Sequence, residues 1–128
     1  MDILLDTHSF LWFIEGDKRM SNTAQELIAD DENDVFLSIA SLWEIAIKAN
    51  LGKLTLAKPF DKLIPEQLRD NSIQLVNISL DDLNEQVILE RHHRDPFDRS
   101  IIAQAISKNL PIVSRDPEFK KYDVRILW

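Results

Sequence analysis

Short apolar runs alternate along this chain with longer segments whose apolar residues recur at helical spacing. Each run is about four residues long and ends at a polar residue, as buried strands do. Ile3-Leu4-Leu5 stops at Asp6, and Val35-Phe36-Leu37 stops at Ser38. The pattern predicts strands at 3–5, 35–38, 73–78, 111–114 and 124–127.

The segments between these runs predict helices, because their apolar residues repeat every three to four positions and capping residues mark their ends. We expect a first helix that ends near Gly16, followed by helices at 21–29, 41–51, 59–71, 79–92 and 97–108. Pro65 should interrupt the segment 59–71 and leave one or two short helices. Apolar residues surround the segment 41–51, so this helix should be buried on most sides.

Strands that alternate with helices are typical of an α/β fold, here a three-layer α/β/α sandwich around a mostly parallel sheet. The 128 residues fit one domain, 1–128, without an internal repeat or linker. There are no cysteines, which excludes disulfides and cysteine zinc sites and suits the cytoplasm. We expect no membrane segment and no secretory signal, since no apolar stretch reaches the roughly 20 residues of a membrane helix.

Acidic residues follow the predicted strands where a parallel sheet would gather them. Asp6 follows the first strand directly, Asp116 follows the fourth with one residue between, and Glu44 lies in the helix after the second strand. Asp98 opens the helix that precedes the strand of Asp116, and Asp95 lies three residues earlier. Open α/β sheets bind ligands beyond the carboxyl ends of their strands. We therefore expect Asp6, Glu44, Asp98 and Asp116 to share one pocket.

Such a pocket is chemically suited to a divalent cation. Crowded carboxylates repel one another and burial raises their pKa, unless a cation binds among them. Oxygen ligands suit Mg²⁺ or Mn²⁺, which can bind a phosphodiester and activate water. Each acid also has an ordinary explanation: Asp6 as a helix cap, Asp98 as a first-turn acid, and Glu44 as the ion-pair partner of Lys48.

Four segments resemble the PIN domain family, in particular the VapC-type toxins of bacterial toxin–antitoxin pairs. They are LLDTHSFLW at 4–12, SIASLWEIAIKANLGKL at 38–54, RDPFDRSIIAQA at 94–105 and IVSRDPEF at 112–119. The resemblance implies a parallel sheet flanked by helices and Mg²⁺- or Mn²⁺-dependent endonucleolytic cleavage of RNA, commonly tRNA or ribosomal RNA. It also implies a homodimer held inactive by a cognate antitoxin.

The resemblance also implies roles for individual residues. The four acids of the family fall on Asp6, Glu44, Asp98 and Asp116, and Asp95 would be an extra ligand or a neighbour of the ligands. Polar and basic residues beside the acids can orient them or contact RNA, although turn bonding and surface ion pairs remain open for each. These candidates for substrate binding are Thr7, Ser38, Lys48, Arg99, Ser114 and Arg115, with Arg94 nearby.

The other aromatic and histidine residues are expected outside the chemistry. His8 is nearest to the predicted site, whereas His92 and His93 fall at a predicted helix end, where a cation is favourable. Trp12 and Trp43 lie among aliphatic neighbours and should pack in the core, although either could stack on a base.

The charge leaves other functions open. Fifteen basic and 22 acidic residues give a net charge of −7, which opposes RNA binding unless a metal reverses the local sign, and which suits a basic protein partner. One alternative is an interaction protein that kept the fold and lost the chemistry. Another is phosphoryl transfer to Asp6; it is disfavoured because dehalogenase-type phosphatases need a second aspartate at position 8, which is His8.

Overall fold

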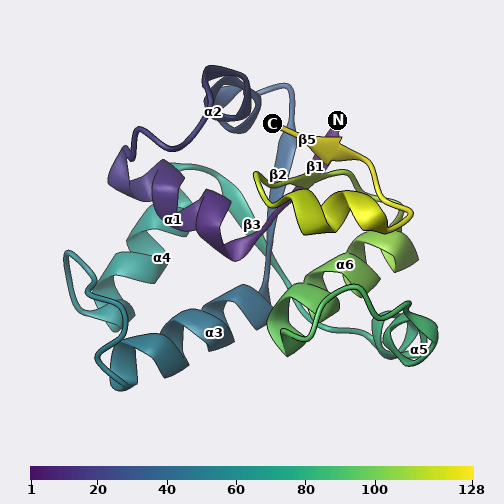
Figure 1. The fold of residues 1–128 in the computed structure, drawn as a ribbon. Helices are drawn as coiled ribbons and strands as arrows, with labels where there is room; N and C mark the ends of the chain where they lie inside the picture. The colour runs from purple at the N-terminus through teal and green to yellow at the C-terminus, as the bar shows by residue number, and fades with distance from the viewer.

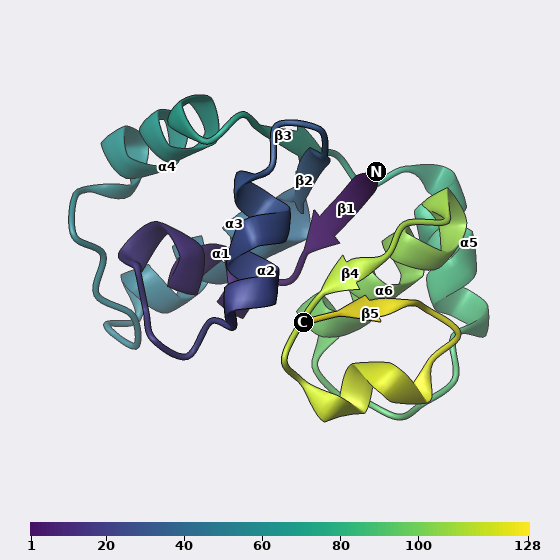
Figure 2. The ribbon, with the colours of Figure 1, turned by 90° about the horizontal axis from the view of Figure 1, so that it is seen from above.

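Five strands form one parallel sheet in the order β3-β2-β1-β4-β5. The structure is a computed structural model that describes residues 1–128. The strands are β1 (Asp2–Leu5), β2 (Asp34–Ser38), β3 (Ile73–Val76), β4 (Ile112–Val113) and β5 (Ile126–Leu127). Because every pair is parallel, the carboxyl ends of the strands meet at one edge of the sheet (Figures 1 and 2). The predicted α/β fold with a parallel sheet is confirmed.

Six α-helices connect the strands. They are α1 (Thr7–Glu15), α2 (Asn22–Ala29), α3 (Ile39–Asn50), α4 (Phe60–Asp70), α5 (Leu80–Ile88) and α6 (Pro96–Lys108). A 3₁₀-helix that the sequence pattern did not predict, η1 (Pro117–Lys121), follows β4. None of the helices is both long and apolar enough to cross a bilayer.

The sheet separates two apolar cores, because successive side chains of a strand point to opposite faces. Ile3 and Leu5 of β1 pack in a cluster with residues of α1, α2, α3 and α4. Leu4, between them, packs with residues of α6 and η1 on the other face. Figure 2 shows these two groups of helices on opposite sides of the strands. Both faces of the sheet are therefore packed against helices, and the candidate acids lie at its carboxyl edge.

The helix α4 contains Pro65 without an interruption, so the expected break is wrong. Proline removes one backbone hydrogen bond from a helix interior. Leu63 and Ile64 are buried on the sheet side of the same turn. The packing of these two side chains offsets the lost hydrogen bond. Helix propensities alone do not include this tertiary packing, so they predict a break.

Replacing Pro65 by Ala is therefore expected to raise the free energy of unfolding by about 1 kcal/mol. Alanine restores an amide donor and is the better helix former, while the loss of proline makes the unfolded chain more flexible and reduces the gain. Urea unfolding followed by circular dichroism measures the difference. Pro59→Ala is the control, since Pro59 lies at the N-cap of α4, where no amide donor is needed. A less stable Pro65→Ala variant would contradict this explanation.

Two further predictions differ from the structure. The helix α5 ends at Ile88 rather than near His92. The chain turns away because the guanidinium of Arg99 donates to the carbonyls of Leu89 and Glu90 at 3.2 and 2.9 Å. The helix α3 is not buried on most sides: Trp43 on its outer face is 60% exposed, since the main contacts of α3 are with β2, α1 and α6.

Candidate active site

Asp6 lies where β1 ends and α1 begins, and its side chain is buried. Its extended backbone makes it the N-cap of α1, and Oδ1 accepts a hydrogen bond from the Ser9 amide at 2.8 Å. Burial raises the pKa of Asp6, although hydrogen bonds from Ser114 and Ser9 oppose this change. The cap therefore fixes the direction of a carboxylate that remains short of compensating positive charge.

Glu44 projects from α3 and is only 3% exposed. Its Oε2 forms an ion pair with Lys48 Nζ at 2.6 Å, one turn along the helix. Its Oε1 is buried and has no hydrogen-bond partner. A buried carboxylate oxygen without a donor is costly, so this atom needs a hydrogen-bond donor or a cation. The ion pair with Lys48 gives Oε2 a partner but leaves Oε1 without one.

Asp98 lies in the first turn of α6 at the centre of the acidic residues. Burial raises its pKa to about 7, and the negative charges of Asp95, Glu44, Asp6 and Asp116 add to the shift. Asp95 precedes Asp98 in the same segment, whereas Glu44, Asp6 and Asp116 come from other parts of the chain. The structure therefore brings the four predicted acids, and Asp95, around one point.

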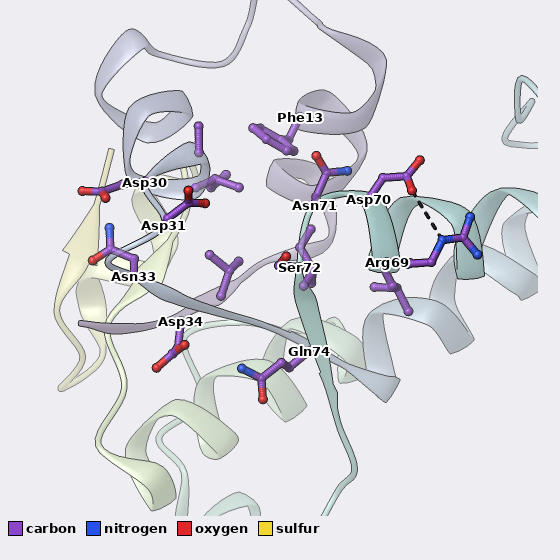
Figure 3. A pocket seen from close by; sticks show the side chains of 15 residues that line it. Phe13, Asp30, Asp31, Asn33, Asp34, Arg69, Asp70, Asn71, Ser72 and Gln74 are labelled. Atoms are coloured by element: carbon purple, nitrogen blue, oxygen red, sulfur yellow. Dashed lines mark ion pairs between the residues drawn. The ribbon is translucent and has the colours of Figure 1, made fainter.

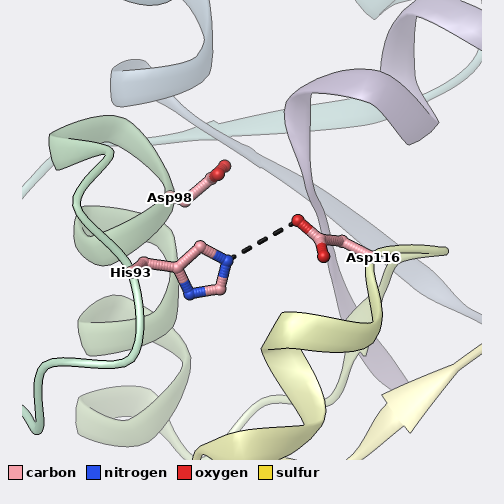
Figure 4. A group of neighbouring side chains, drawn as sticks. All are labelled: His93, Asp98 and Asp116. Carbon is pink, nitrogen blue, oxygen red and sulfur yellow. Dashed lines mark ion pairs between the residues drawn. The ribbon is translucent and has the colours of Figure 1, made fainter.

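His93, Asp98 and Asp116 form the tightest group in this region. One potential ligand atom from each lies within 4.8 Å of those of the other two. Figure 4 shows the three side chains directed toward one another from the loop before α6, from α6 and from the turn before η1. His93 Nε2 lies 3.6 Å from Asp116 Oδ2. Neither ring nitrogen of His93 has a hydrogen-bond partner, so the imidazole is available to a ligand or a water.

His93 is a site residue that the sequence analysis missed. Its amide donates to the Tyr122 hydroxyl at 2.8 Å, and its ring stacks on that of Tyr122 at 5.5 Å. The early end of α5 frees residue 93 from the helix in which we expected it. The available signal was its place two residues before Asp95, at the start of the segment that carries Asp98.

Asp95 and Asp116 also cap helices. Asp95 Oδ1 accepts from the amides of Phe97 and Asp98 at 2.8 and 3.0 Å. Asp116 Oδ1 accepts from the Glu118 amide at 2.9 Å, and the Asp116 amide donates to Ser114 Oγ. Capping turns each carboxylate toward the amino end of its helix, where the helix dipole favours negative charge. Asp95 thereby anchors the turn from which Asp98 projects.

This arrangement of acids at the carboxyl edge of a parallel sheet can be compared with known proteins. The sequence matches the PIN domain family over residues 3–125. The chain belongs to this family. The predicted resemblance to the PIN domain family is confirmed.

One curated relative carries the name VapC, and several similar solved structures carry the name VapBC. Ribonuclease VapC16 of Mycobacterium tuberculosis is 40% identical over 48 residues, which are 38% of this chain and 34% of that protein. The matched stretch thus spans about a third of the relative's length.

Two solved structures share the whole fold. VapBC2 from Rickettsia felis, bound to a DNA fragment from its promoter, gives a TM-score of 0.73 at 17% identity and covers 98% of this chain and 97% of its own. DNA-bound VapBC from Salmonella typhimurium gives a TM-score of 0.72 at 18% identity and covers 98% of this chain and 96% of its own. At these identities, the similarity to both structures shows a shared fold and nothing more.

One basic residue expected to contact substrate is placed elsewhere in this PIN domain. Arg99 is buried, and its guanidinium is bonded to the carbonyls of Leu89 and Glu90. The expectation that Arg99 binds substrate is therefore wrong, since its charge is used inside the protein. Arg115 is exposed beside Asp116, and Lys48 is half-buried beside Glu44, so both remain candidates.

The small hydroxyl residues next to the acids lie in the interior of the PIN domain. Thr7, Ser38 and Ser114 are buried. Thr7 Oγ1 donates to Ser41 Oγ at 3.0 Å, and Ser38 Oγ accepts from the Ala40 amide at the start of α3. A hydrogen bond from Ser114 lowers the pKa of Asp6, and Ser114 Oγ accepts from the Asp116 amide at 3.1 Å. The direct contact with substrate that we expected of these hydroxyls does not fit their burial.

The largest cavity of the PIN domain lies away from these acids. It has a volume of about 530 Å³ and lies beside the starts of β2 and β3, at the opposite edge of the sheet. Figure 3 shows exposed acids and an exposed amide around it, among them Asp31, Asp34 and Gln74. None of the predicted site residues lines it. A smaller cavity of about 370 Å³ adjoins the candidate acids Asp6 and Asp116.

Proposed function

We propose that this PIN domain is a metal-dependent endoribonuclease that acts as the toxin of a toxin–antitoxin pair. The observation that carries the proposal is the set of carboxylates around Asp98, which raise its pKa to about 7 together with burial. A fold that gathers buried like charges pays for them in stability, and such sites are where function is expected. Membership of the PIN domain family and the partial match to a named ribonuclease support the reaction class.

The residues present fit a divalent cation. Glu44 Oε1 is buried without a donor, and the carboxyl of Asp98 holds a proton near neutrality that a cation would displace. We propose Asp6, Glu44, Asp98 and Asp116 as the catalytic and metal-binding acids, with His93 beside them. Carboxylate oxygens favour Mg²⁺ or Mn²⁺. Bound there, such an ion supplies Lewis-acid activation of a water and of the scissile phosphodiester.

The other residues of the site hold these groups in place. The amide of Ser9 and the hydroxyl of Ser114 direct the carboxylate of Asp6. Lys48 binds one oxygen of Glu44, and the other oxygen is left without a hydrogen-bond partner. Asp95 caps the helix turn that presents Asp98. Fixed directions of this kind reduce the reorganisation that binding and catalysis require.

An antitoxin and a second copy of the chain are the proposed protein partners. The solved neighbours are VapBC assemblies, and the net charge of −7 suits a basic antitoxin segment. Exposed apolar side chains support a homodimer: Trp43 on α3, Leu51 just after it, and Leu80, Val87 and Ile88 on α5. We place the activity in the cytoplasm, with tRNA or ribosomal RNA as the substrate class.

Metal-dependent cleavage of RNA by the purified protein tests the proposal. We expect structured RNA to be cut with Mn²⁺ or Mg²⁺, and a chelator to lower the rate roughly tenfold or more, because water activation is lost. Restoring Mn²⁺ in excess should restore the rate, and gel analysis of end-labelled RNA measures it. Cleavage that is unaffected by chelation would contradict the metal mechanism. A folded protein that cuts no RNA under either condition would favour the alternative of an interaction protein.

A further inference from the structure

Two hollows open on either side of a ridge beside the acids. The first, of about 370 Å³, is lined by Asp6 and Asp116 together with Arg115. The second, of about 250 Å³, is lined by Glu44 together with Lys48 and Lys53. The ridge between them consists of the three residues that line both: His8, Trp12 and Arg19. A strand that crosses the acids therefore meets this ridge.

Trp12 lies at the centre of the ridge, and the guanidinium groups of two arginines lie over its ring. The guanidinium of Arg19 lies 4.9 Å from the ring centroid, and that of Arg115 lies 6.0 Å away. The exposed ring of His8 lies 5.7 Å from the Trp12 ring with a tilt of 42°. The core position expected for Trp12 is thus half correct: the indole packs against the apolar cluster from one side and lines both hollows from the other.

The two arginines differ in how firmly they are held. Arg19 is anchored by an ion pair with Asp17 at 2.8 Å. Arg115 is exposed and forms no ion pair, and it is the more distant of the two from the ring. A base that approaches the indole can therefore displace Arg115 at little cost. Its charge then becomes available to a phosphate next to the acids.

We propose that Trp12, His8, Arg19 and Arg115 form a binding site for one unpaired nucleotide next to the scissile phosphate. The base stacks on the indole of Trp12, and Arg115 and Arg19 bind the flanking phosphates. Stacking on an aromatic side chain needs a base that is free of its own helix, so the site selects loops or single strands. In a chain of net charge −7, these cations also supply the local attraction that RNA requires. The inference rests on the proposed ribonuclease function.

The test uses Trp12→Leu and Arg115→Ala, with Arg125→Ala as the matched control. Leucine keeps the apolar packing of position 12 and removes the stacking surface. Arg125 is exposed next to β5 at the other edge of the sheet. The probes are a fluorescein-labelled single-stranded RNA decamer and a series of decamers in which one abasic sugar is moved along the strand. Anisotropy measures the Kd in the Asp6→Asn background, and cleavage of the intact decamer by the otherwise wild-type chain gives KM and kcat.

We expect Trp12→Leu to weaken binding of the intact decamer about tenfold, as the loss of one stacked base does. In the series of abasic decamers, one position should weaken binding to the Asp6→Asn protein by a similar factor. Adding Trp12→Leu should not weaken the binding of that particular decamer any further. Arg115→Ala should weaken the intact and abasic decamers alike, with KM raised more than kcat is lowered. Arg125→Ala should change neither Kd nor KM.

The outcomes separate this site from the proposed function. If the wild-type chain cleaves the decamer and Trp12→Leu and Arg115→Ala leave Kd and KM unchanged, the nucleotide site is overturned and the ribonuclease remains. If Trp12→Leu weakens intact and abasic decamers equally, the base does not stack there and the proposal also fails. If the wild-type chain cuts no RNA, the proposed function falls and the site falls with it. Circular dichroism of each variant shows whether a loss arises from unfolding.

Discussion

Replacing Asp6 by Asn, or Glu44 by Gln, is expected to lower the rate of RNA cleavage at least roughly 100-fold while the fold is kept. Both changes remove a negative charge from the candidate metal pocket and leave a side chain of nearly the same shape. Asparagine is also a good N-cap, so the hydrogen bond from the Ser9 amide to position 6 can persist. The loss should therefore appear in catalysis and metal affinity, and the thermal transition should stay close to that of the wild type.

The matched control for this prediction is Asp34→Asn. Asp34 is an exposed acid in the large cavity at the opposite edge of the sheet, so the change in net charge is the same. Cleavage of end-labelled RNA with Mn²⁺ gives the rates of all variants. If Asp6→Asn and Glu44→Gln cleave as fast as Asp34→Asn, the carboxylates have no part in the reaction.

Asp98→Asn is expected to change activity and stability in opposite directions. Cleavage should fall at least about 100-fold, because the acid at the centre of the cluster is lost. In the absence of divalent ions at pH 7, the midpoint of thermal unfolding should rise by roughly 3–8 °C, which corresponds to about 1–2 kcal/mol. The gain arises because asparagine removes a buried group that repels Asp95, Glu44, Asp6 and Asp116.

The pH dependence follows from the direction of the Asp98 shift. Its pKa is about 7 in the folded chain against 3.8 for the ordinary group, so between about pH 4 and pH 7 the folded state binds the extra proton. The free energy of unfolding contributed by this group therefore decreases as the pH rises through that window. Thermal scans of the chelated protein at pH 5 and pH 7 should show a smaller stability gain for Asp98→Asn at pH 5. Destabilisation by Asp98→Asn at pH 7 would contradict the electrostatic explanation.

The acids could be predicted from the sequence because their positions depend on a rule of parallel sheets. Asp6 directly follows β1, and Asp116 follows β4 with two residues between; because β1 and β4 are parallel neighbours in the sheet, their pairing brings both acids to the same edge. Glu44 and Asp98 depend in addition on the direction of a helix. The resemblance to the PIN domain family added the order of the four acids, and the match over residues 3–125 confirms the family.

Features decided by long-range contacts could not be predicted in this way. The early end of α5 depends on Arg99, which lies nine and ten residues beyond the carbonyls of Glu90 and Leu89 that it binds. Because Arg99 binds the carbonyls of Leu89 and Glu90, its side chain does not reach the acids. The same early end of α5 leaves His93 in the loop, where it lies beside Asp98 and Asp116. Likewise, the exposure of Trp43 depends on which elements pack against α3, and an apolar pattern alone cannot distinguish a core face from an exposed one.

Metal binding in one place is the central claim, and a crystal structure grown with Mn²⁺ tests it most directly, through the anomalous signal of manganese. The account predicts a manganese peak among the carboxylates of Asp6, Asp98 and Asp116, and loss of that peak in Asp98→Asn. The exposed acids around the large cavity, such as Asp31 and Asp34, provide an internal comparison in the same crystal. No peak at Asp98, or a peak only beside Asp31 and Asp34, would contradict the account.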